Sequence, residues 1–108
     1  MAEYFYDVAA GEKIGQLAAY VGPSLQALMQ ANEKIMADGA LPRKTKELIA
    51  LACAHITRCP YCIDAHTKQA VAAGASEAEI AEAIMVAVAL SMGAPLAHSS
   101  IALKALGK

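Results

Sequence analysis

Two cysteines and a histidine lie close together near the middle of the chain. Cys59, Cys62 and His66 follow the pattern C-x-x-C-x-x-x-H. Because residues three and four positions apart share one face of a helix, the three side chains can converge there. Residues three apart in a helical turn have Cα atoms about 5 Å from each other, which is within the range that a disulfide bridges. The two cysteines can therefore form and open a disulfide with little movement of the backbone.

The position of this motif also favours a thiolate. Pro60 suits the start of a helix and would place Cys62 in its first turn, where unpaired N–H groups stabilise an anion. His66, one turn further, can accept the thiol proton, and Glu47 from the preceding helix can orient the histidine. We therefore predict that Cys62 is the low-pKa nucleophile and that Cys59, at the helix N-cap, reacts second. The same amides can lower the pKa of a cap residue, so this order is favoured and not forced.

A metal site is the main alternative interpretation of a C-x-x-C pair. Structural zinc takes four ligands, and the motif supplies three of them. The fourth would have to come from Glu47, His55 or His98, and the sequence holds no second C-x-x-C pair. A c-type haem site would need a histidine directly after the second cysteine, where Ile63 stands, and a thioredoxin module would need a βαβ framework. We therefore expect neither a metal nor a cofactor.

The other reactive side chains have simpler interpretations. Cys53 lies between alanines in the middle of a predicted helix and is interpreted as a small buried hydrophobe. His55 has Leu48 and Leu51 near it on the same helix, which indicates a core or interface histidine rather than a ligand. His98 lies near the end of the chain and is interpreted as a capping or surface residue.

The composition indicates one small, apolar, helical domain. The chain has 108 residues, and two domains of half that size would each be too small to bury a workable core. Hydrophobic residues make up 57% of it and charged residues 18%, with a mean hydropathy of +0.40, which excludes a disordered chain. Lys and Arg number 9 against 10 Asp and Glu, so no basic excess exists to attract a nucleic acid. Strong helix formers without alternating strand patterns predict an all-α domain.

Hydrophobic spacing and capping residues predict where the helices lie. Residues 1–22 form an N-terminal segment with one possible short helix, and residues 23–108 form the domain. Ser76 and Glu79 have the spacing of a capping box at a helix start, while Gly93 and Pro95 predict a helix end. The predicted helices of the domain cover residues 24–36, 42–57, 60 to about 73, 77–92 and 96–106.

Two of the predicted helices are apolar on almost every face, over residues 48–56 and 83–92. Five or six helices in so short a chain cannot surround both, so we expect other subunits to cover part of this surface, and a monomer with an apolar patch is the alternative. The longest uninterrupted apolar run, residues 83–90, is shorter than the roughly 18 to 20 residues that span a bilayer, and the acidic start is unlike a secretory signal. We therefore expect no membrane span and a cytoplasmic location. In that reducing compartment a close cysteine pair is typical of catalysis or metal binding.

Glu47, an apolar helix and then Cys59-x-x-Cys62-x-x-x-His66 together resemble the carboxymuconolactone decarboxylase superfamily, and within it the alkyl hydroperoxidase D-like branch. The segment 74–83 is similar as well, and the resemblance covers roughly residues 25–105. It implies an all-α fold built around a helical hairpin, assembled as trimers or hexamers, with thiol peroxidase or disulfide reductase activity. By position, Cys62 would be the peroxidatic cysteine and Cys59 the resolving thiol and proton donor. His66 and Glu47 would form the proton relay.

Functions of different classes follow from these residues. The first is an enzyme that reduces a small hydroperoxide through Cys59 and Cys62 and is reduced in turn by an external dithiol, of the lipoyl or thioredoxin type. The second is a protein whose disulfide serves redox sensing or exchange with a partner. Tyr61 bears on the choice, because alkyl hydroperoxidase D proper has a histidine immediately before the second cysteine, so the relay is incomplete here. A carboxymuconolactone decarboxylase-like enzyme is a further alternative, although the branch that names the superfamily lacks this cysteine pair. Ligand binding in the oligomer core, without redox turnover, is a weaker one.

Overall fold

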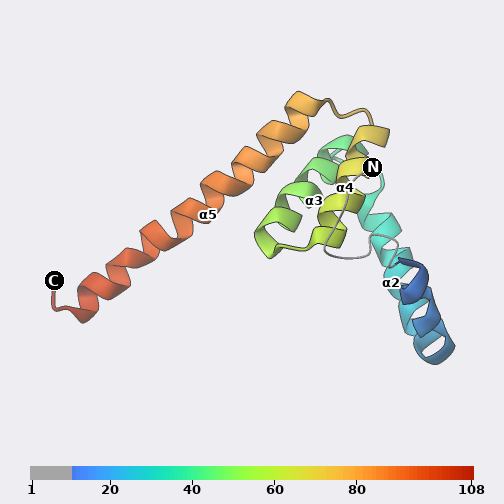
Figure 1. Ribbon diagram of the computed structural model, residues 1–108, viewed down its shortest axis with the longest axis horizontal. Helices are drawn as coiled ribbons and strands as arrows, with labels where there is room; N and C mark the ends of the chain where they lie inside the picture. The colour runs from blue at the N-terminus through green and yellow to red at the C-terminus, as the bar shows by residue number, and fades with distance from the viewer. Residues whose placement is uncertain (1–10) are drawn as a thin grey trace.

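The computed structural model describes residues 11–108, and every regular element within that range is a helix (Figure 1). In chain order these are α1 (Gly11–Ile14), the 3-10 helix η1 (Gly15–Leu17), α2 (Ala18–Met36), α3 (Arg43–Thr57), α4 (Pro60–Ala72) and α5 (Glu77–Ala105). The all-α prediction is confirmed. The first ten residues of the predicted N-terminal segment lie outside the described residues, and the possible short helix within that segment falls on α1, η1 and the start of α2.

Helices α3 and α4 lie side by side at the centre of the molecule as a helical hairpin (Figure 1). Helix α3 ends at Arg58, whose backbone lies in the left-handed region (φ 59°, ψ 43°). This residue reverses the chain directly into Cys59 and Pro60, the N-cap and the first residue of α4, as the sequence predicted. The buried side chains of the hairpin are Glu47, Leu51 and Ala54 from α3 and Ala70 from α4.

Lys46 of α3 contacts the C-terminal end of α2. The Lys46 Nζ atom donates hydrogen bonds to the carbonyl oxygens of Ile35 (2.8 Å) and Ala37 (2.7 Å). These carbonyls lie at the C-terminal end of α2, where backbone oxygens lack a partner within the helix. Near its start α2 has a non-helical residue, Val21 (φ −129°, ψ 33°), so the helix predicted from residue 24 continues α2 beyond a kink.

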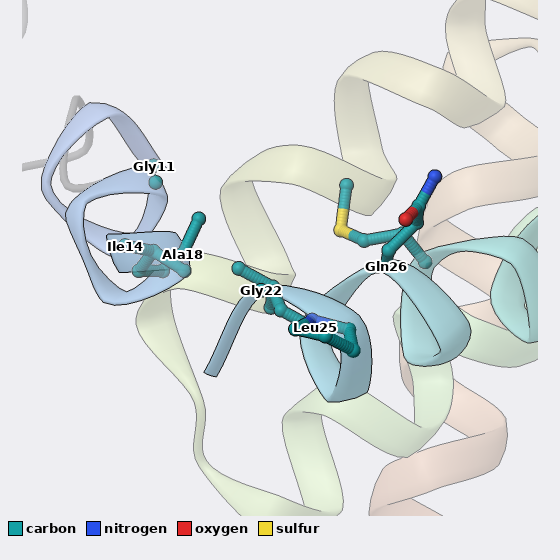
Figure 2. A pocket seen from close by; sticks show the side chains of 9 residues that line it. Gly11, Ile14, Ala18, Gly22, Leu25 and Gln26 are labelled. Atoms are coloured by element: carbon teal, nitrogen blue, oxygen red, sulfur yellow. The ribbon is translucent and has the colours of Figure 1, made fainter. Parts of the chain in front are cut away.

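A cavity of about 560 Å³ opens where the chain turns from α1 and η1 into α2 (Figure 2). Its lining includes Ile14, Ala18, Leu25 and Met29, with Gln26 as its single polar side chain. None of the residues predicted for redox chemistry lines it. It therefore offers an apolar surface without a group that could transfer protons or electrons.

The connection from α4 to α5 is built as the sequence predicted. Gly74 has a positive φ of 98°, which glycine adopts without steric cost, and the chain then enters the α5 N-cap at Ser76. The Ser76 hydroxyl accepts from the Glu79 N–H (3.1 Å), and the Glu79 carboxylate accepts from the Ser76 N–H (2.9 Å). Glu79 also pairs with Lys44 of α3 at 2.9 Å. The capping box is thus confirmed, and it joins α5 to the hairpin.

The predicted break within the C-terminal region is wrong. Helix α5 runs without interruption through Gly93 and Pro95, where the sequence predicted one helix ending at residue 92 and another starting at 96. A proline inside a helix costs about 3 kcal/mol and a glycine about 1 kcal/mol relative to alanine. The fixed φ of proline is nevertheless close to helical, and a long helix keeps its hydrogen bonds on both sides of the missing donor. The penalty therefore weakens the helix at this point without ending it.

The second half of α5 extends away from the hairpin, toward the C-terminus at the far end of the molecule (Figure 1). Its large apolar side chains are exposed, including Met92 (69%) and Leu96 (74%). Among the described residues, α5 is the one helix long and apolar enough to cross a membrane, and 6% of its most apolar 18-residue stretch is buried. The core helix of a folded protein can have the same length and the same apolar composition.

Candidate redox site

Cys59 occupies the N-cap of α4, as the sequence predicted. Its backbone is extended (φ −96°, ψ 102°), and Pro60 follows at the first helical position. The Cys59 Sγ atom accepts a hydrogen bond from the backbone N–H of Cys62 at 3.2 Å. The sulfur atom thereby replaces the hydroxyl or carboxylate oxygen that caps most helices, and it lies where backbone N–H groups stabilise negative charge.

The two thiols of the motif are in direct contact. The Cys59 and Cys62 Sγ atoms are 2.7 Å apart, so a hydrogen bond joins the two sulfur atoms. Both cysteines are free and half-buried, so the site is in its dithiol form. The predicted convergence of the pair is confirmed.

The acidities of the two thiols are the reverse of those predicted. The hydrogen bond from the Cys62 thiol, together with bonds from the backbone of Cys62 and Tyr61, lowers the pKa of Cys59 below its usual value. The pKa of Cys62 is raised, first because its thiol proton is held by Cys59, and further by burial and by the charge of the Cys59 thiolate. The Cys59 sulfur, at the N-cap, accepts a backbone N–H that has no partner within the helix. The Cys62 sulfur, in the first turn, does not accept such a group. In the dithiol, Cys59 is therefore the more acidic of the two cysteines.

A second hydrogen-bonded pair joins α3 to α4, one helical turn along α4 from Cys62. The Glu47 side chain is fully buried, and its Oε1 and Oε2 atoms lie 3.2 Å and 3.5 Å from Nδ1 of His66. Because an ionised carboxylate only accepts hydrogen bonds, Nδ1 of His66 is assigned the proton and Nε2 remains an acceptor. The predicted contact between the glutamate and the histidine is confirmed. Among residues 11–108, no hydrogen bond joins His66 to either thiol, but His66 and Cys62 are four residues apart on one face of α4.

One residue of this site, Gln69, was not predicted from the sequence. Its amide nitrogen donates to Oε2 of Glu47 at 2.7 Å and to Oε1 at 3.2 Å, in the orientation that keeps the amide oxygen away from the carboxylate. Gln69 follows His66 by three positions, so the helical spacing that identified His66 also places Gln69 on the same face. Glutamine is common on solvated helix faces, so its residue type alone does not mark Gln69 as part of a site. Its contact with the fully buried Glu47 does.

The remaining candidates lie outside the site. Cys53 is exposed on α3, which corrects its interpretation as a buried hydrophobe, because the apolar side of α3 that faces α4 carries Leu51 and Ala54 instead. The His55 Nδ1 atom pairs with the carbonyl oxygen of Leu51 at 2.8 Å, and His98 is exposed on the far half of α5. Residues 11–108 contain no group of three or more His, Cys, Asp or Glu side chains placed to hold a metal ion.

The site therefore combines a dithiol with a carboxylate-oriented imidazole on two consecutive helices. The dithiol supplies two electrons when it closes to a disulfide. The imidazole Nε2 can accept the proton that Cys62 retains, while the lowered pKa of Cys59 makes that thiol easier to ionise. These are the groups that two-electron redox chemistry by thiols requires.

Comparison with known proteins finds a matching family and related sequences. The profile of the Carboxymuconolactone decarboxylase family matches residues 23–105. Protein 4 of the cox locus of Paracoccus denitrificans, which is uncharacterized, is 46% identical over 80 residues, covering 74% of this chain and 72% of that protein. An alkyl hydroperoxide reductase from Mycobacterium tuberculosis is 44% identical over 57 residues, which are 53% of this chain but only 16% of the relative.

Solved structures share the helical arrangement. The crystal structure of a carboxymuconolactone decarboxylase family protein from Legionella pneumophila superposes with a TM-score of 0.73 at 30% identity, covering 90% of this chain and 87% of that one. A protein from Methanobacterium thermoautotrophicum superposes with a TM-score of 0.66 at 31% identity, covering 78% and 93% of the two chains.

Proposed function

From the premise that this chain belongs to the carboxymuconolactone decarboxylase family, we propose that it is a thiol peroxidase of the alkyl hydroperoxidase D-like type. The observation that carries the proposal is the contact of 2.7 Å between the Cys59 and Cys62 sulfur atoms, one helical turn from His66 and its buried partner Glu47. The partial match to an alkyl hydroperoxide reductase supports the same chemistry.

The reaction begins at Cys62. Nε2 of His66 takes the proton of the Cys62 thiol, and the resulting thiolate attacks the terminal oxygen of a hydroperoxide. The O–O bond breaks, Cys62 becomes a sulfenic acid, and the leaving alkoxide takes the proton from Nε2 of His66 to give the alcohol, which returns His66 to its starting form. Cys59 then attacks the Cys62 sulfur as a thiolate and forms the disulfide, and the departing hydroxide takes up the proton that the Cys59 thiol gave up, so that water is released. An external dithiol reduces the disulfide by exchange and is itself oxidised.

A raised pKa at Cys62 explains why this mechanism needs a base. Burial and the hydrogen bond to Cys59 keep the proton on Cys62, so Cys62 becomes a thiolate only when a neighbouring group accepts that proton. Glu47 fixes His66 with Nδ1 as the donor, which leaves Nε2 for this task. Cys59 has its own stabilisation from the helix N-terminus and is ready to resolve the sulfenic acid.

The lowered pKa of Cys59 supports a second candidate function, disulfide exchange with a partner. A thiolate at the N-cap of a helix, paired with a protonated second cysteine, can attack the disulfide of another molecule directly. In that reaction Cys59 acts first and Cys62 resolves the mixed disulfide. The two functions therefore differ in which cysteine is the nucleophile.

One experiment separates them. The Cys59→Ser and Cys62→Ser variants, each also carrying Cys53→Ser, are treated with cumene hydroperoxide and then with dimedone, which labels sulfenic acids. The peroxidase predicts a dimedone adduct at Cys62 in the Cys59→Ser variant, formed as fast as wild-type thiols disappear. A fast adduct only at Cys59, in the Cys62→Ser variant, contradicts the assigned roles. If neither variant reacts with the hydroperoxide while Cys59 exchanges rapidly with a dithiol-disulfide such as oxidised lipoamide, exchange is the function.

We further propose that the protein assembles into a homo-oligomer. Large apolar side chains along α2 and α5 are exposed in a single copy, among them Leu28 (68%) and Leu90 (69%). Exposed apolar surface on this scale marks an interface, and a second copy presents the same surface for it to pack against.

A further inference from the structure

The carboxylate of Glu47 depends on few donors. Its side chain is fully buried, and burial of a charge is tolerated only where hydrogen bonds replace those of water. Within residues 11–108 the donors to it are Nδ1 of His66 and the amide nitrogen of Gln69. Each of these side chains comes from α4, whereas the carboxylate comes from α3.

The glutamine makes the shorter of these contacts. Gln69 approaches Oε2 at 2.7 Å, whereas His66 Nδ1 approaches Oε1 at 3.2 Å and Oε2 at 3.5 Å. Gln69 is itself exposed and lies at the rim of a shallow cavity of about 220 Å³ with Arg43 and Ala72. Gln69 is therefore partly in solvent while its amide nitrogen contacts the buried carboxylate of Glu47.

We propose that Gln69 is a positioning residue of this site, which holds Glu47 as a carboxylate against Nδ1 of His66 and so keeps Nε2 of His66 free to accept a proton. The effect on thiol oxidation rests on the proposed peroxidase function, whereas the effect on His66 rests on the hydrogen bonds alone. The amide nitrogen suits this role because it only donates, so it stabilises the ionised carboxylate and not the neutral acid.

Removing this donor has a defined consequence for the histidine. A buried carboxylate that loses a hydrogen bond favours its neutral form. A neutral Glu47 carries a proton that it can donate to Nδ1 of His66. The imidazole proton would then move to Nε2, which becomes a donor and can no longer take the proton of Cys62.

The test compares Gln69→Met, which keeps the length of the side chain but has no donor, with Gln69→Lys, which restores one. Gln30→Met places the same substitution on the exposed surface of α2 and serves as the matched control. The tautomer of His66 is read from the nitrogen chemical shifts of ¹⁵N-labelled histidine in the reduced protein. We expect the proton on Nδ1 in wild type, in the control and in Gln69→Lys, and on Nε2 in Gln69→Met.

The second readout is the pH profile of Cys62 oxidation by cumene hydroperoxide in a Cys59→Ser background. Without the base, we expect Gln69→Met to react about a hundredfold more slowly near neutral pH, at the lower end of what a positioned base contributes. Its profile should shift to higher pH, where the thiol ionises without help. Gln69→Lys should recover most of the rate.

The outcomes distinguish this inference from the peroxidase proposal. If Gln69→Met keeps the proton of His66 on Nδ1 and the wild-type pH profile, Gln69 positions nothing and the inference is wrong, whatever the wild-type activity. If the tautomer changes as expected but wild-type protein does not react with hydroperoxides, the peroxidase proposal fails and the role of Gln69 stands.

Discussion

The sulfur atom of Cys59 lies 2.7 Å from that of Cys62 and also accepts the backbone N–H of Cys62 at 3.2 Å. One residue thus stabilises Cys59 through two different groups, a thiol and an amide. Substitution of the side chain removes the first and leaves the second. This allows the two contributions to the pKa of Cys59 to be separated.

Cys62→Ala is expected to raise the pKa of Cys59 from its wild-type position, because the thiol of Cys62 is the largest cause of the lowering. The amide remains, so the pKa of Cys59 should stay below that of an ordinary cysteine. Alkylation by iodoacetamide measured against pH, in a Cys53→Ala background, reports this directly. The half-maximal rate should move to higher pH and the rate at pH 7 should fall severalfold.

The converse substitution checks the direction. In Cys59→Ala, Cys62 loses both the acceptor of its proton and the neighbouring thiolate, so the pKa of Cys62 should fall from its raised position. Cys62 should then alkylate at lower pH than in the wild-type dithiol. Equal profiles for Cys62 with and without the Cys59 thiol would contradict the coupling.

Glu47→Gln is expected to weaken both stability and reactivity. The substitution keeps the shape of the side chain but replaces an acceptor of two hydrogen bonds by an amide, which sets donor against donor at His66 or Gln69. Loss of a buried hydrogen bond of this kind costs roughly 1 to 3 kcal/mol of unfolding free energy. Urea denaturation at one fixed protein concentration measures the cost, and Glu33→Gln, on the exposed surface of α2, is the control. Matching midpoints for the two variants would show that the buried contact contributes nothing.

Arg58→Gly is expected to stabilise the hairpin by up to about 1 kcal/mol. A non-glycine residue in the left-handed region costs roughly 1 to 2 kcal/mol, and the greater flexibility of glycine in the unfolded chain offsets about half of that gain. Arg58→Ala retains the backbone strain and loses the same side chain, so it isolates the backbone term. If the alanine variant unfolds at the same or higher urea concentration than the glycine variant, Arg58 is not strained.

Local features of this fold were predictable because their causes are local. The break at Cys59 and Pro60 and the capping box of Ser76 and Glu79 depend on residues within one helical turn. The position of Glu47 near the motif was also predictable, because the chain reverses tightly between two consecutive helices. These features needed no knowledge of distant contacts.

Other features depend on relations that a sequence pattern does not contain. The role of Gln69 follows from the complete burial of Glu47, which arises from packing of α3 against α4. The acidity order of the cysteines depends on which sulfur accepts the amide N–H, and helical spacing places both near it. The continuation of α5 through Pro95 is a balance between one local penalty and many retained hydrogen bonds.

We expect other copies of this chain to cover α5. A single copy leaves Leu96 74% exposed, and its mass would be 11.2 kDa. If copies of this chain pack along α5, light scattering at micromolar concentration should give a multiple of that mass. Leu96→Glu places a charge in the apolar contact, where an unpaired charge is strongly unfavourable, and should shift the mass toward one chain. Val71→Glu introduces the same charge at an exposed apolar position of α4 and should leave the oligomer intact. A wild-type mass near that of one chain, with binding to lipid vesicles that Leu96→Glu abolishes, would mean that lipid and not a second copy covers the helix.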